Sequence, residues 1–586
     1  MVTTQTHARV GSRVARGISA VAALAVTCGL GAAGWAFAPD AGAKKQKAPE
    51  RPNVVVVMSD DQTSDSMRFM NAINAQVGDA GATFENSFAS FPLCCPSRAT
   101  YLTGQYPHNH GVMANQAPDG GFAQLDSSNT LPVWLQQAGY HTAHIGKYLN
   151  GYEQFPDLEP PGWSEWYGST RTYRFYDYTL NENGSLVTYG TTADQYQTDV
   201  YTQKAVEFID RRAPEEQPFF LSVAYLAPHS GGPNVNPQPP ADCDNTAKPA
   251  PRHATAFDSE PLPQPASFNE EDVFDKPAEI QGLAPLTAEQ ITNIERRYRC
   301  RVESLLAVDE GVARILDALA RSGELADTLF IYTSDNGFFH GEHRIPGGKH
   351  RLYEPSARVP LLLRGPGIPA NVTVADLAVN ADLAPTILEA AGATAGRAID
   401  GRSLIGAAEH PGRLQGRAIL IETRNYSAVR TARYKYAVHD TGEVELYDLQ
   451  NDPDELQSLH TDPAFDQVES ALATLLSNIQ SCSGAACQAL PGLNLKLAYK
   501  RGKDDRGRRC AEGAVKAIVK GSDRGAVIAA EFAVGSKAVG SDDAAPFKER
   551  ISSGKLKKKG KSTVIATATL LDGRVRTVDD RVRRCS

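Results

Sequence analysis

Three apolar runs along the chain share one layout, because polar side chains follow each of them directly. They are residues 53–58, followed by Asp60 and Asp61; residues 219–226, followed by His229; and residues 328–333, followed by Asp335 and Asn336. Continuous apolar, largely β-branched runs are typical of strands buried on both faces of a parallel sheet. Helical patterns such as residues 303–320 lie between them. The pattern therefore predicts a doubly wound α/β core whose polar groups meet at the carboxyl ends of the strands, where ligands bind.

The pattern changes twice farther along the chain. After about residue 394 it consists of short strands and turns, and residues 433–437 and 445–449 predict a hairpin. From residue 493 onward, β-rich stretches alternate with Gly, Ser and Asp turns, which predicts a small β-sandwich. We therefore expect an α/β domain over 50–394, a smaller α+β subdomain over 395–480 and a β-rich accessory domain over 493–586. Residues 230–285 lack periodicity and predict a long excursion beside the substrate pocket.

The N-terminus has the pattern of an export signal, expected over residues 1–43. Arg9, Arg13 and Arg16 precede an apolar stretch over residues 18–38, and two small-residue cleavage motifs follow. An uncleaved membrane anchor is the alternative, because the stretch approaches the ~20 residues that span a bilayer. Either way the pattern predicts a secreted or extracytoplasmic protein.

The nine cysteines fit an exported chain, where disulfides persist. The expected pairs are Cys482–Cys487, Cys510–Cys585 and, less strongly, Cys243–Cys300. Cys94 and Cys95 are adjacent, and a disulfide between neighbours is geometrically awkward. These two thiols therefore need another explanation.

Composition narrows the function only slightly. The 586 residues exceed one ordinary domain, and a hydrophobic content of 41% permits a sizeable core. We interpret the net charge of −8 as spread along the chain. This argues against a nucleic-acid partner, which would need a clustered basic face. The basic run over residues 555–559 is either a solvated face or a contact for an anionic polymer.

Residues 94–104 explain the cysteine pair. The segment begins Cys94-Cys95-Pro96-Ser97-Arg98 and ends Leu102-Thr103-Gly104. It resembles the signature of the sulfatase family, in which the first cysteine is oxidised to formylglycine after translation. The resemblance implies that Cys94 is the modified residue and that a formylglycine-generating enzyme is a partner in maturation.

The resemblance extends over about residues 50–480 and is nearest to N-acetylglucosamine-6-sulfatases and extracellular heparan sulfatases. The segments that carry it are residues 94–98, 106–110, 146–150 and 162–167. It implies an alkaline-phosphatase-like sulfatase fold and a sulfated carbohydrate substrate, 6-O-sulfo-N-acetylglucosamine or a similar sugar. The charge and the N-terminal pattern add two expectations: no nucleic-acid partner, and membrane contact only through the signal or an uncleaved anchor.

The strand-end residues Asp60, Asp61, Asp335 and Asn336 offer only oxygen ligands. Such a set suits a hard cation, calcium or magnesium, rather than zinc. A single aspartate in such a place is often only a turn or helix cap, but carboxylates at two separate strand ends favour a metal site. The resemblance implies one calcium ion, with residue 94 as a further ligand.

The family mechanism assigns roles to the remaining site residues. The hydrated formylglycine attacks sulfur, the alcohol leaves, and the sulfated diol then expels sulfate. Arg98 would hold the diol, while Lys147 and Lys349 would bind sulfate oxygens as point charges. His229 would orient sulfate or protonate the leaving oxygen.

One departure from the family leaves open which residue deprotonates the diol. Many sulfatases carry Gly-Lys-Trp-His-Leu-Gly where this chain has residues 146–151, so Leu149 replaces the usual histidine. Asn150 cannot act as a general base. His108, His110 and His343 are alternatives for that role, and each is also consistent with a hydrogen-bonded loop histidine.

Two other functions compete with a sulfatase. One is a phosphonate or phosphodiester hydrolase, since sulfatase-like folds also host those activities. The other is a non-catalytic binder of sulfated glycans in which Cys94 stays unmodified. The lysines, the metal-ligand set and the complete maturation motif favour the sulfatase.

Overall fold

A computed structural model describes residues 51–232, 243 and 245–585. The predicted export signal over 1–43 lies outside the described residues. Within them, none of the helices combines the length and the apolar character that crossing a membrane requires.

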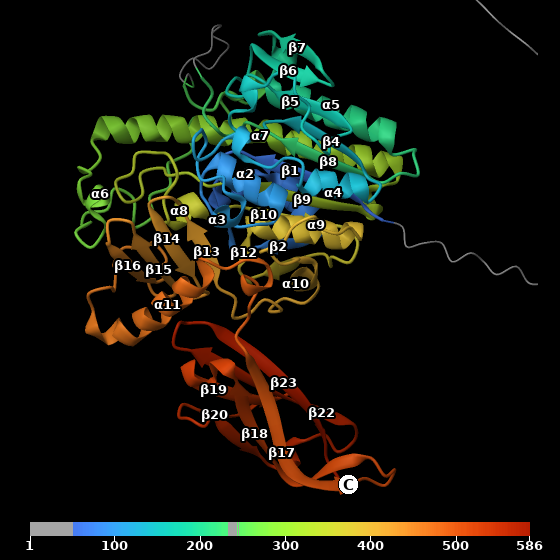
Figure 1. The fold of residues 1–586 in the computed structure, drawn as a ribbon. Helices are drawn as coiled ribbons and strands as arrows, with labels where there is room; N and C mark the ends of the chain where they lie inside the picture. Colours follow the sequence, from blue (N-terminus) through green and yellow to red (C-terminus); the bar gives the residue numbers. More distant parts are fainter. Residues whose placement is uncertain (1–50, 233–242, 244, 586) are drawn as a thin grey trace, which may run out of the picture. The chain divides into compact units, whose positions relative to one another are not determined.

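The centre of the molecule is a mixed sheet of ten strands (Figure 1). In spatial order the strands are β11 (Val372–Val374), β2 (Ala82–Phe84), β10 (Leu361–Arg364), β9 (Thr328–Ser334), β1 (Asn53–Ser59), β8 (Phe219–Ala224), β4 (His141–Gly146), β5 (Glu165–Ser169), β6 (Tyr178–Glu182) and β7 (Ser185–Tyr189). The five strands from β9 to β5 run parallel. The predicted parallel core is therefore confirmed for the strands that carry the polar ends.

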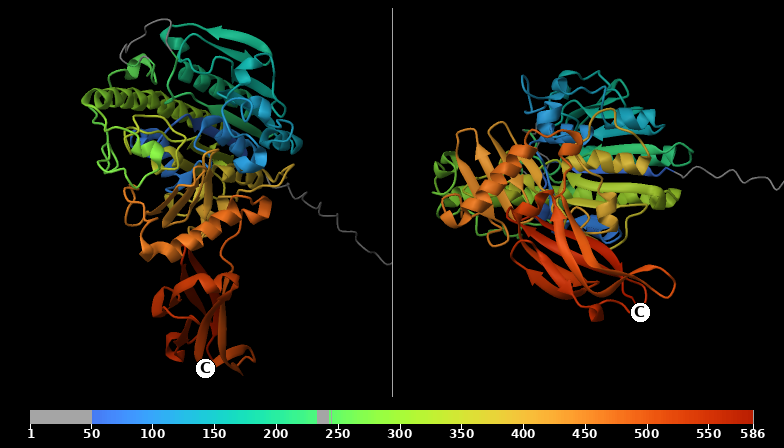
Figure 2. Two further views of the ribbon diagram at one scale, coloured as in Figure 1. Left: turned by 60° about the vertical axis from the view of Figure 1, so that its left-hand side comes forward. Right: turned by 60° about the horizontal axis from the view of Figure 1, so that its bottom comes forward.

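The sheet is buried on both faces, which explains the β-branched run in β1. Val54 and Val56 pack into one hydrophobic cluster, while Val55 and Val57 pack into the cluster on the opposite face. The main helices of the α/β domain are α2 (Cys94–Thr103), α4 (Leu131–Gln137), α5 (Gln197–Arg212), α7 (Ala288–Ser322), α9 (Leu383–Ala391) and α10 (Ile405–Glu409). The two faces are covered by α2, α4 and α9 on one side and by α5 and α7 on the other (Figures 1 and 2).

Outside the five parallel strands the sheet is mixed, because β6, β7 and β10 run antiparallel to their neighbours, which the sequence pattern did not address. Between β6 and β7 lie only Asn183 and Gly184, both at positive φ. An Asn-Gly pair in this conformation makes the tight turn that joins antiparallel strands. Local turn chemistry therefore sets the direction of β7 against β6.

Two further regions follow the large sheet. The first is a four-stranded antiparallel sheet of β13 (Ile419–Glu422), β14 (Tyr426–Arg430), β15 (Tyr434–His439) and β16 (Val444–Asp448), packed against α11 (Asp466–Ile479). The second consists of two antiparallel sheets. One has β17 (Leu493–Lys503), β18 (Arg509–Gly521) and β21 (Lys548–Ile551); the other has β20 (Lys537–Asp542), β19 (Val527–Val534), β22 (Lys561–Leu570) and β23 (Val575–Arg583). These two sheets enclose a separate hydrophobic cluster.

The three predicted disulfides are present, at Cys243–Cys300, Cys482–Cys487 and Cys510–Cys585. The first ties the irregular excursion to α7, and the last closes the C-terminal sandwich. Cys94 and Cys95 are free thiols, and both are buried.

Candidate active site

The functional candidates from four strands meet at one edge of the sheet. Asp60 and Asp61 follow β1, and Asp335 and Asn336 follow β9, its parallel neighbour. Lys147 follows β4 and His229 lies in the loop after β8. Because parallel strands end at the same edge, residues far apart in the sequence come together there.

Helix α2 brings the cysteine to this edge. Cys94 is the first residue of the helix and Arg98 lies one turn later. The Ser97 hydroxyl contacts the Asp335 carbonyl and accepts a hydrogen bond from Asn380 Nδ2 at 2.9 Å, which fixes the start of the helix against the strand end. The positive end of the helix dipole therefore faces the cluster and favours negative charge there.

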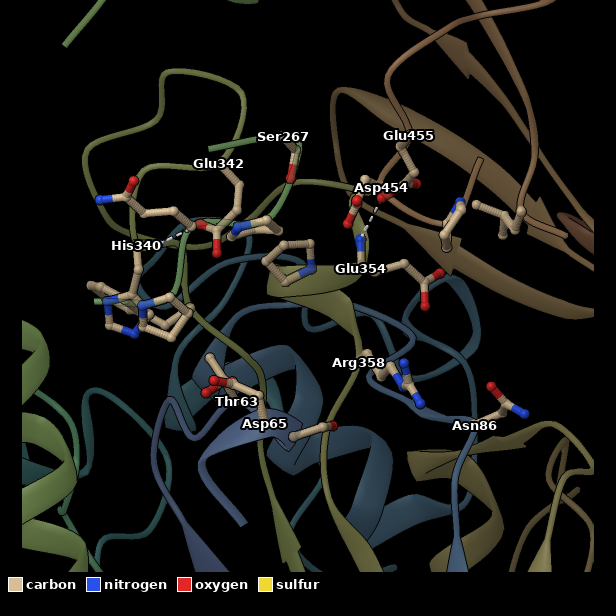
Figure 3. A pocket seen from close by; sticks show the side chains of 18 of the residues that line it. Thr63, Asp65, Asn86, Ser267, His340, Glu342, Glu354, Arg358, Asp454 and Glu455 are labelled. Carbon is tan, nitrogen blue, oxygen red and sulfur yellow. Dashed lines mark hydrogen bonds between the residues drawn. The ribbon is translucent and has the colours of Figure 1, made fainter. Parts of the chain in front are cut away.

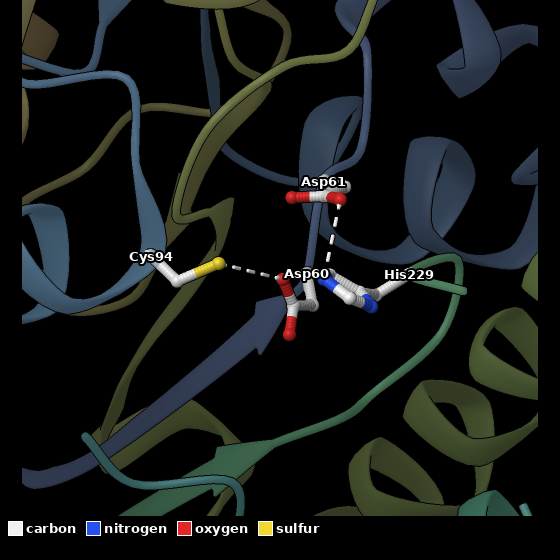
Figure 4. Close-up of side chains that lie close together, drawn as sticks. All are labelled: Asp60, Asp61, Cys94 and His229. Carbon is white, nitrogen blue, oxygen red and sulfur yellow. Dashed lines mark hydrogen bonds and ion pairs between the residues drawn. The ribbon is translucent and has the colours of Figure 1, made fainter. Parts of the chain in front are cut away.

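Cys94 contacts both a carboxylate and an ammonium group. Its Sγ lies 3.5 Å from Asp60 Oδ1, and Lys349 Nζ donates to the same sulfur at 2.7 Å. The possible ligand atoms of Asp60, Asp61, Cys94 and His229 all lie within 4.8 Å of one another (Figure 4). The cluster is thus a single small site rather than two neighbouring ones.

Buried cations compensate the carboxylates. Lys147 contacts Asp60, and Lys349 contacts Asp61. Arg98 Nε donates to Asp335 Oδ2 at 2.8 Å. Burying a carboxylate without such a partner would be costly, so the cations and carboxylates hold one another in place.

The protonation of the site follows from this pairing. Burial raises the pKa of Asp61, but nearby positive charge, above all that of Lys349, outweighs burial and lowers it to about 2. Burial and, next, the Asp60 carboxylate raise the pKa of the Cys94 thiol to about 12. At neutral pH the thiol stays protonated, so the unmodified cysteine is a poor nucleophile.

His229 lies at the exposed side of the cluster. Its Nδ1 is 2.7 Å from the Ser230 carbonyl, and its Nε2 is 3.6 Å from Asp61 Oδ2. Burial lowers the pKa of His229, against the opposing effect of Asp61. The neutral ring therefore donates from Nδ1 to Ser230, which leaves Nε2 facing the cluster as an acceptor.

The donor set fits a hard cation. Asp60, Asp61 and Asp335 are fully buried carboxylates, and Asn336 Nδ2 donates to Asp61 at 2.7 Å. The Asn336 Oδ1 atom is buried and has no hydrogen-bond partner among the described residues. Buried polar oxygens are normally satisfied, so an unpaired oxygen on a side chain that contacts the Asp61 carboxylate is what a calcium ligand requires.

Leu149 and Asn150, where the chain departs from the family, offer no side chain that could act as a general base. Leu149 is buried in a hydrophobic cluster, and the Asn150 amide Nδ2 lies 2.5 Å from the Tyr173 hydroxyl. The Tyr173 ring lies 5.0 Å from Lys147 Nζ and 4.9 Å from the His229 ring. Sequence reasoning missed Tyr173, because no motif marks the loop after β5 that carries it.

The three alternative histidines have other partners. His108 Nδ1 is 2.8 Å from Glu422, His110 Nε2 is 3.0 Å from the Thr100 hydroxyl, and His343 Nδ1 is 2.6 Å from Glu270. Burial lowers the pKa of His110 to about 3. His108 and His110 lie in the short helix α3 (Pro107–His110) rather than in a loop, and His343 lies in a loop. All three rings are hydrogen-bonded, and none of the described contacts joins them to Cys94.

A cavity of about 710 Å³ lies near this region but does not contain the cluster (Figure 3). It is lined by Thr63, Asp65, His340, Glu342 and Glu354, among others. None of the residues assigned above to catalysis or metal binding lines it. Charge compensation around Cys94, rather than cavity size, therefore identifies the site.

Comparison with known proteins agrees with this geometry. The family model described as Sulfatase matches residues 52–393, and the model described as N-sulphoglucosamine sulphohydrolase, C-terminal, matches residues 341–482. Human N-acetylglucosamine-6-sulfatase is 34% identical over 499 residues, which cover 76% of this chain and 87% of that protein. An extracellular sulfatase homologue of Caenorhabditis elegans is 36% identical over 360 residues, which cover 60% of this chain but only 48% of that protein.

A solved structure shows the same fold. It is a protein in complex with its substrate D-glucosamine-2-N,6-O-disulfate, 26% identical, with a TM-score of 0.60. The alignment covers 73% of this chain and 97% of that one.

Proposed function

The chain belongs to the sulfatase family and is a sulfuric ester hydrolase, and from this premise we propose that it desulfates a sulfated sugar through a formylglycine at position 94 and one calcium ion. The observation that carries the proposal is the contact of Cys94 Sγ with Asp60 at 3.5 Å and with Lys349 at 2.7 Å. A residue in that position touches both an acidic metal ligand and a cation suited to sulfate.

The chemistry of residue 94 supports conversion to the aldehyde. A thiol whose pKa is raised to about 12 by burial and Asp60 offers almost no thiolate at neutral pH. The hydrated aldehyde supplies an oxygen nucleophile instead. Arg98, which donates to Asp335 at 2.8 Å and lies 3.7 Å from Asp60, holds the carboxylates on either side of that nucleophile.

A calcium ion would be held by Asp60, Asp61, Asp335 and Asn336, with residue 94 as a further ligand. Its charge would draw sulfuryl oxygens toward the nucleophile. The support is chemical: all four side chains offer oxygen, and the Asn336 oxygen has no described partner.

The substrate sulfate would lie between Lys147, Lys349 and His229. The two lysines contact the carboxylates and remain protonated, since those carboxylates outweigh the effect of burial and raise both pKa values. His229 Nε2 must gain a proton before it can donate to the leaving oxygen. A sulfate anion beside the ring would raise its pKa and favour that proton.

The substrate class is proposed from the relatives. Proteins named N-acetylglucosamine-6-sulfatase align over most of their length, and the 26%-identical structure holds a 6-O-sulfated glucosamine. We propose a 6-O-sulfo-N-acetylglucosamine unit as the substrate. The three disulfides support a secreted or extracytoplasmic location, and the C. elegans relative is named an extracellular sulfatase.

The test combines mass spectrometry with turnover. Protein made with a formylglycine-generating enzyme should show the aldehyde on the peptide that contains Cys94 and should release sulfate from N-acetylglucosamine-6-sulfate. The control is protein made without that enzyme. Release by unmodified protein would contradict the role of the aldehyde, and faster turnover of a phosphonate monoester would favour the alternative hydrolase.

A further inference from the structure

The charge of the chain is divided between two regions, contrary to the expectation that it is spread evenly. Residues 493–586 contain 23 Lys and Arg against 11 Asp and Glu, a formal net charge of +12. Residues 1–492 contain 37 Lys and Arg against 57 Asp and Glu, a net charge of −20. A small module of strongly opposite sign indicates a charged partner.

Part of this positive charge is gathered on one sheet face. In β18, Val515, Ala517 and Val519 are fully buried, so the alternate residues point outward from the sandwich. The register of β17 and β21 against β18 places outward residues of all three strands in common rows. The resulting basic face consists of Lys496, Lys516, Lys520, Lys548 and Arg550.

The cations of the basic face lie close together. Lys516 is directly opposite Arg550, and Ile518 is flanked by Lys496 and Lys548 in the next row. Neighbouring strands are about 4.8 Å apart and successive outward residues about 7 Å apart. Like charges directly opposite each other destabilise a sheet, so this arrangement costs stability unless an anion binds to it.

The basic face has little internal compensation. Among the residues that the structure describes, none forms an ion pair with any of its five cations. Asp542 lies at the rim, where it accepts a hydrogen bond from the Lys548 backbone amide at 2.9 Å. By contrast, the outer face of the other sheet mixes Lys561, Arg581 and Arg583 with Glu531 and Asp579.

We infer that the basic face binds a sulfated polysaccharide and holds the polymer close to the enzyme. The choice of polymer rests on the proposed function, since a polysaccharide that carries the substrate sulfate esters is itself a polyanion. A body of net charge −20 repels such a polymer, and the C-terminal sandwich supplies the opposite charge.

The chemistry of the face favours this partner over two other polyanionic partners. Single-stranded nucleic acid is held by aromatic stacking platforms, and the outward residues of the three strands include no aromatic side chain. Binding in a membrane interface needs inserted apolar side chains, and the one large apolar residue of the face, Ile518, is half-buried. An array of cations without either feature suits a chain of sulfate groups.

The test compares two full-length variants that lose the same charge. The face variant is Lys496→Gln/Lys516→Gln/Lys548→Gln/Arg550→Gln. The control variant is Arg524→Gln/Lys537→Gln/Lys561→Gln/Arg581→Gln, whose four cations are exposed elsewhere in the same sandwich. Binding to immobilised heparin is measured over a range of NaCl concentrations, with desulfated heparin, single-stranded DNA and anionic phospholipid vesicles as further arms.

We expect the face variant to bind heparin at least ~10-fold more weakly and with a smaller salt dependence, and the control variant to lose less than ~3-fold. Heparin should raise the melting temperature of the wild type and of the control but not of the face variant. Folding should survive, because the substitutions remove like-charge repulsion. The pair variant Lys516→Gln/Arg550→Gln provides a milder second test, with an expected loss of ~3-fold.

Equal losses in the face and control variants would overturn the inference. So would equal binding of desulfated heparin, or binding of DNA or vesicles that depends on the face while heparin binding does not. Turnover of N-acetylglucosamine-6-sulfate, measured in parallel, should be unchanged in both variants. If no variant turns it over but heparin binding depends on the face, the proposed function fails and the basic face stands.

Discussion

In the α/β domain the charged groups of the site are buried and paired, whereas those of the basic face are exposed and unpaired. Lys147, Lys349 and Arg98 each contact a carboxylate at the strand ends. On the basic face, Lys516 faces Arg550 with no carboxylate between them. Paired buried charges fix the geometry of a site. Unpaired exposed charges attract a partner over a distance, and this attraction weakens as the salt concentration rises. Changes in the two regions should therefore have different kinds of effect.

The largest expected effect separates the two adjacent cysteines. Cys94→Ala should lower kcat/KM for a small sulfate ester by at least ~10⁴-fold, because removal of a nucleophile leaves only binding and charge stabilisation. Cys95→Ala should lower it by less than ~10-fold, since the Cys95 sulfur points to the Asn150 carbonyl 4.0 Å away. The measurement is initial-rate kinetics on folded protein. Equal loss in both variants would contradict the assignment of Cys94.

Metal removal should have the next largest effect. Chelation should reduce turnover by roughly 10³-fold, in keeping with the several kcal/mol that a metal contributes to charge stabilisation. Calcium should restore activity better than zinc, because the donor set contains only oxygen. Basic-face binding to heparin should not change on chelation, which makes it the matched control. Full activity of protein shown to be metal-free would rule out the metal site.

Much of the site could be predicted from the sequence, because parallel strands impose where their ends lie. The β-branched run of β1 predicted that this strand is buried and that Asp60 and Asp61 lie at its carboxyl end. The antiparallel pairing of β6 and β7 was not predicted, because it depends on the Asn183-Gly184 turn rather than on the hydrophobic pattern. The basic face was also missed, because the net charge of −8 for the whole chain conceals two regions of opposite sign.

His229 should matter less than residue 94 or the metal. His229→Ala should lower kcat by roughly 10²–10³-fold, the lower part of the range that a general acid contributes. The loss should shrink with an aryl sulfate whose leaving group needs no proton, whereas a purely structural role would affect both substrates alike. Comparison of a sugar sulfate with such an aryl sulfate provides the measurement. Equal losses would mean that His229 orients sulfate but does not protonate the leaving oxygen.

Tyr173 offers a smaller test of how the buried cations are positioned. Its ring lies 5.0 Å from Lys147 Nζ and 4.9 Å from the His229 ring, while its hydroxyl contacts Asn150. Tyr173→Ala should raise KM by ~10-fold, because loss of a buried cation–π contact costs up to about 2 kcal/mol. Tyr173→Phe keeps the ring and should stay within ~3-fold of the wild type. If the phenylalanine variant is as impaired as the alanine variant, the hydroxyl rather than the ring is the important group.

The smallest expected effect is that of removing the C-terminal sandwich, which we propose is a separate module. Its two sheets enclose their own hydrophobic cluster, and the Cys510–Cys585 disulfide lies within it. The hydrogen bonds that join it to the rest of the protein include those from Arg576 and Thr577 to Gln415, which lies outside the catalytic cluster. A chain that ends at Gly492 should therefore turn over a small aryl sulfate within ~2-fold of the full-length protein at matched formylglycine content. The same truncation should weaken heparin binding at least as much as the face variant does. If the truncated protein folds but loses most of its turnover of the small ester, the sandwich belongs to the catalytic unit and the comparison between the two regions fails.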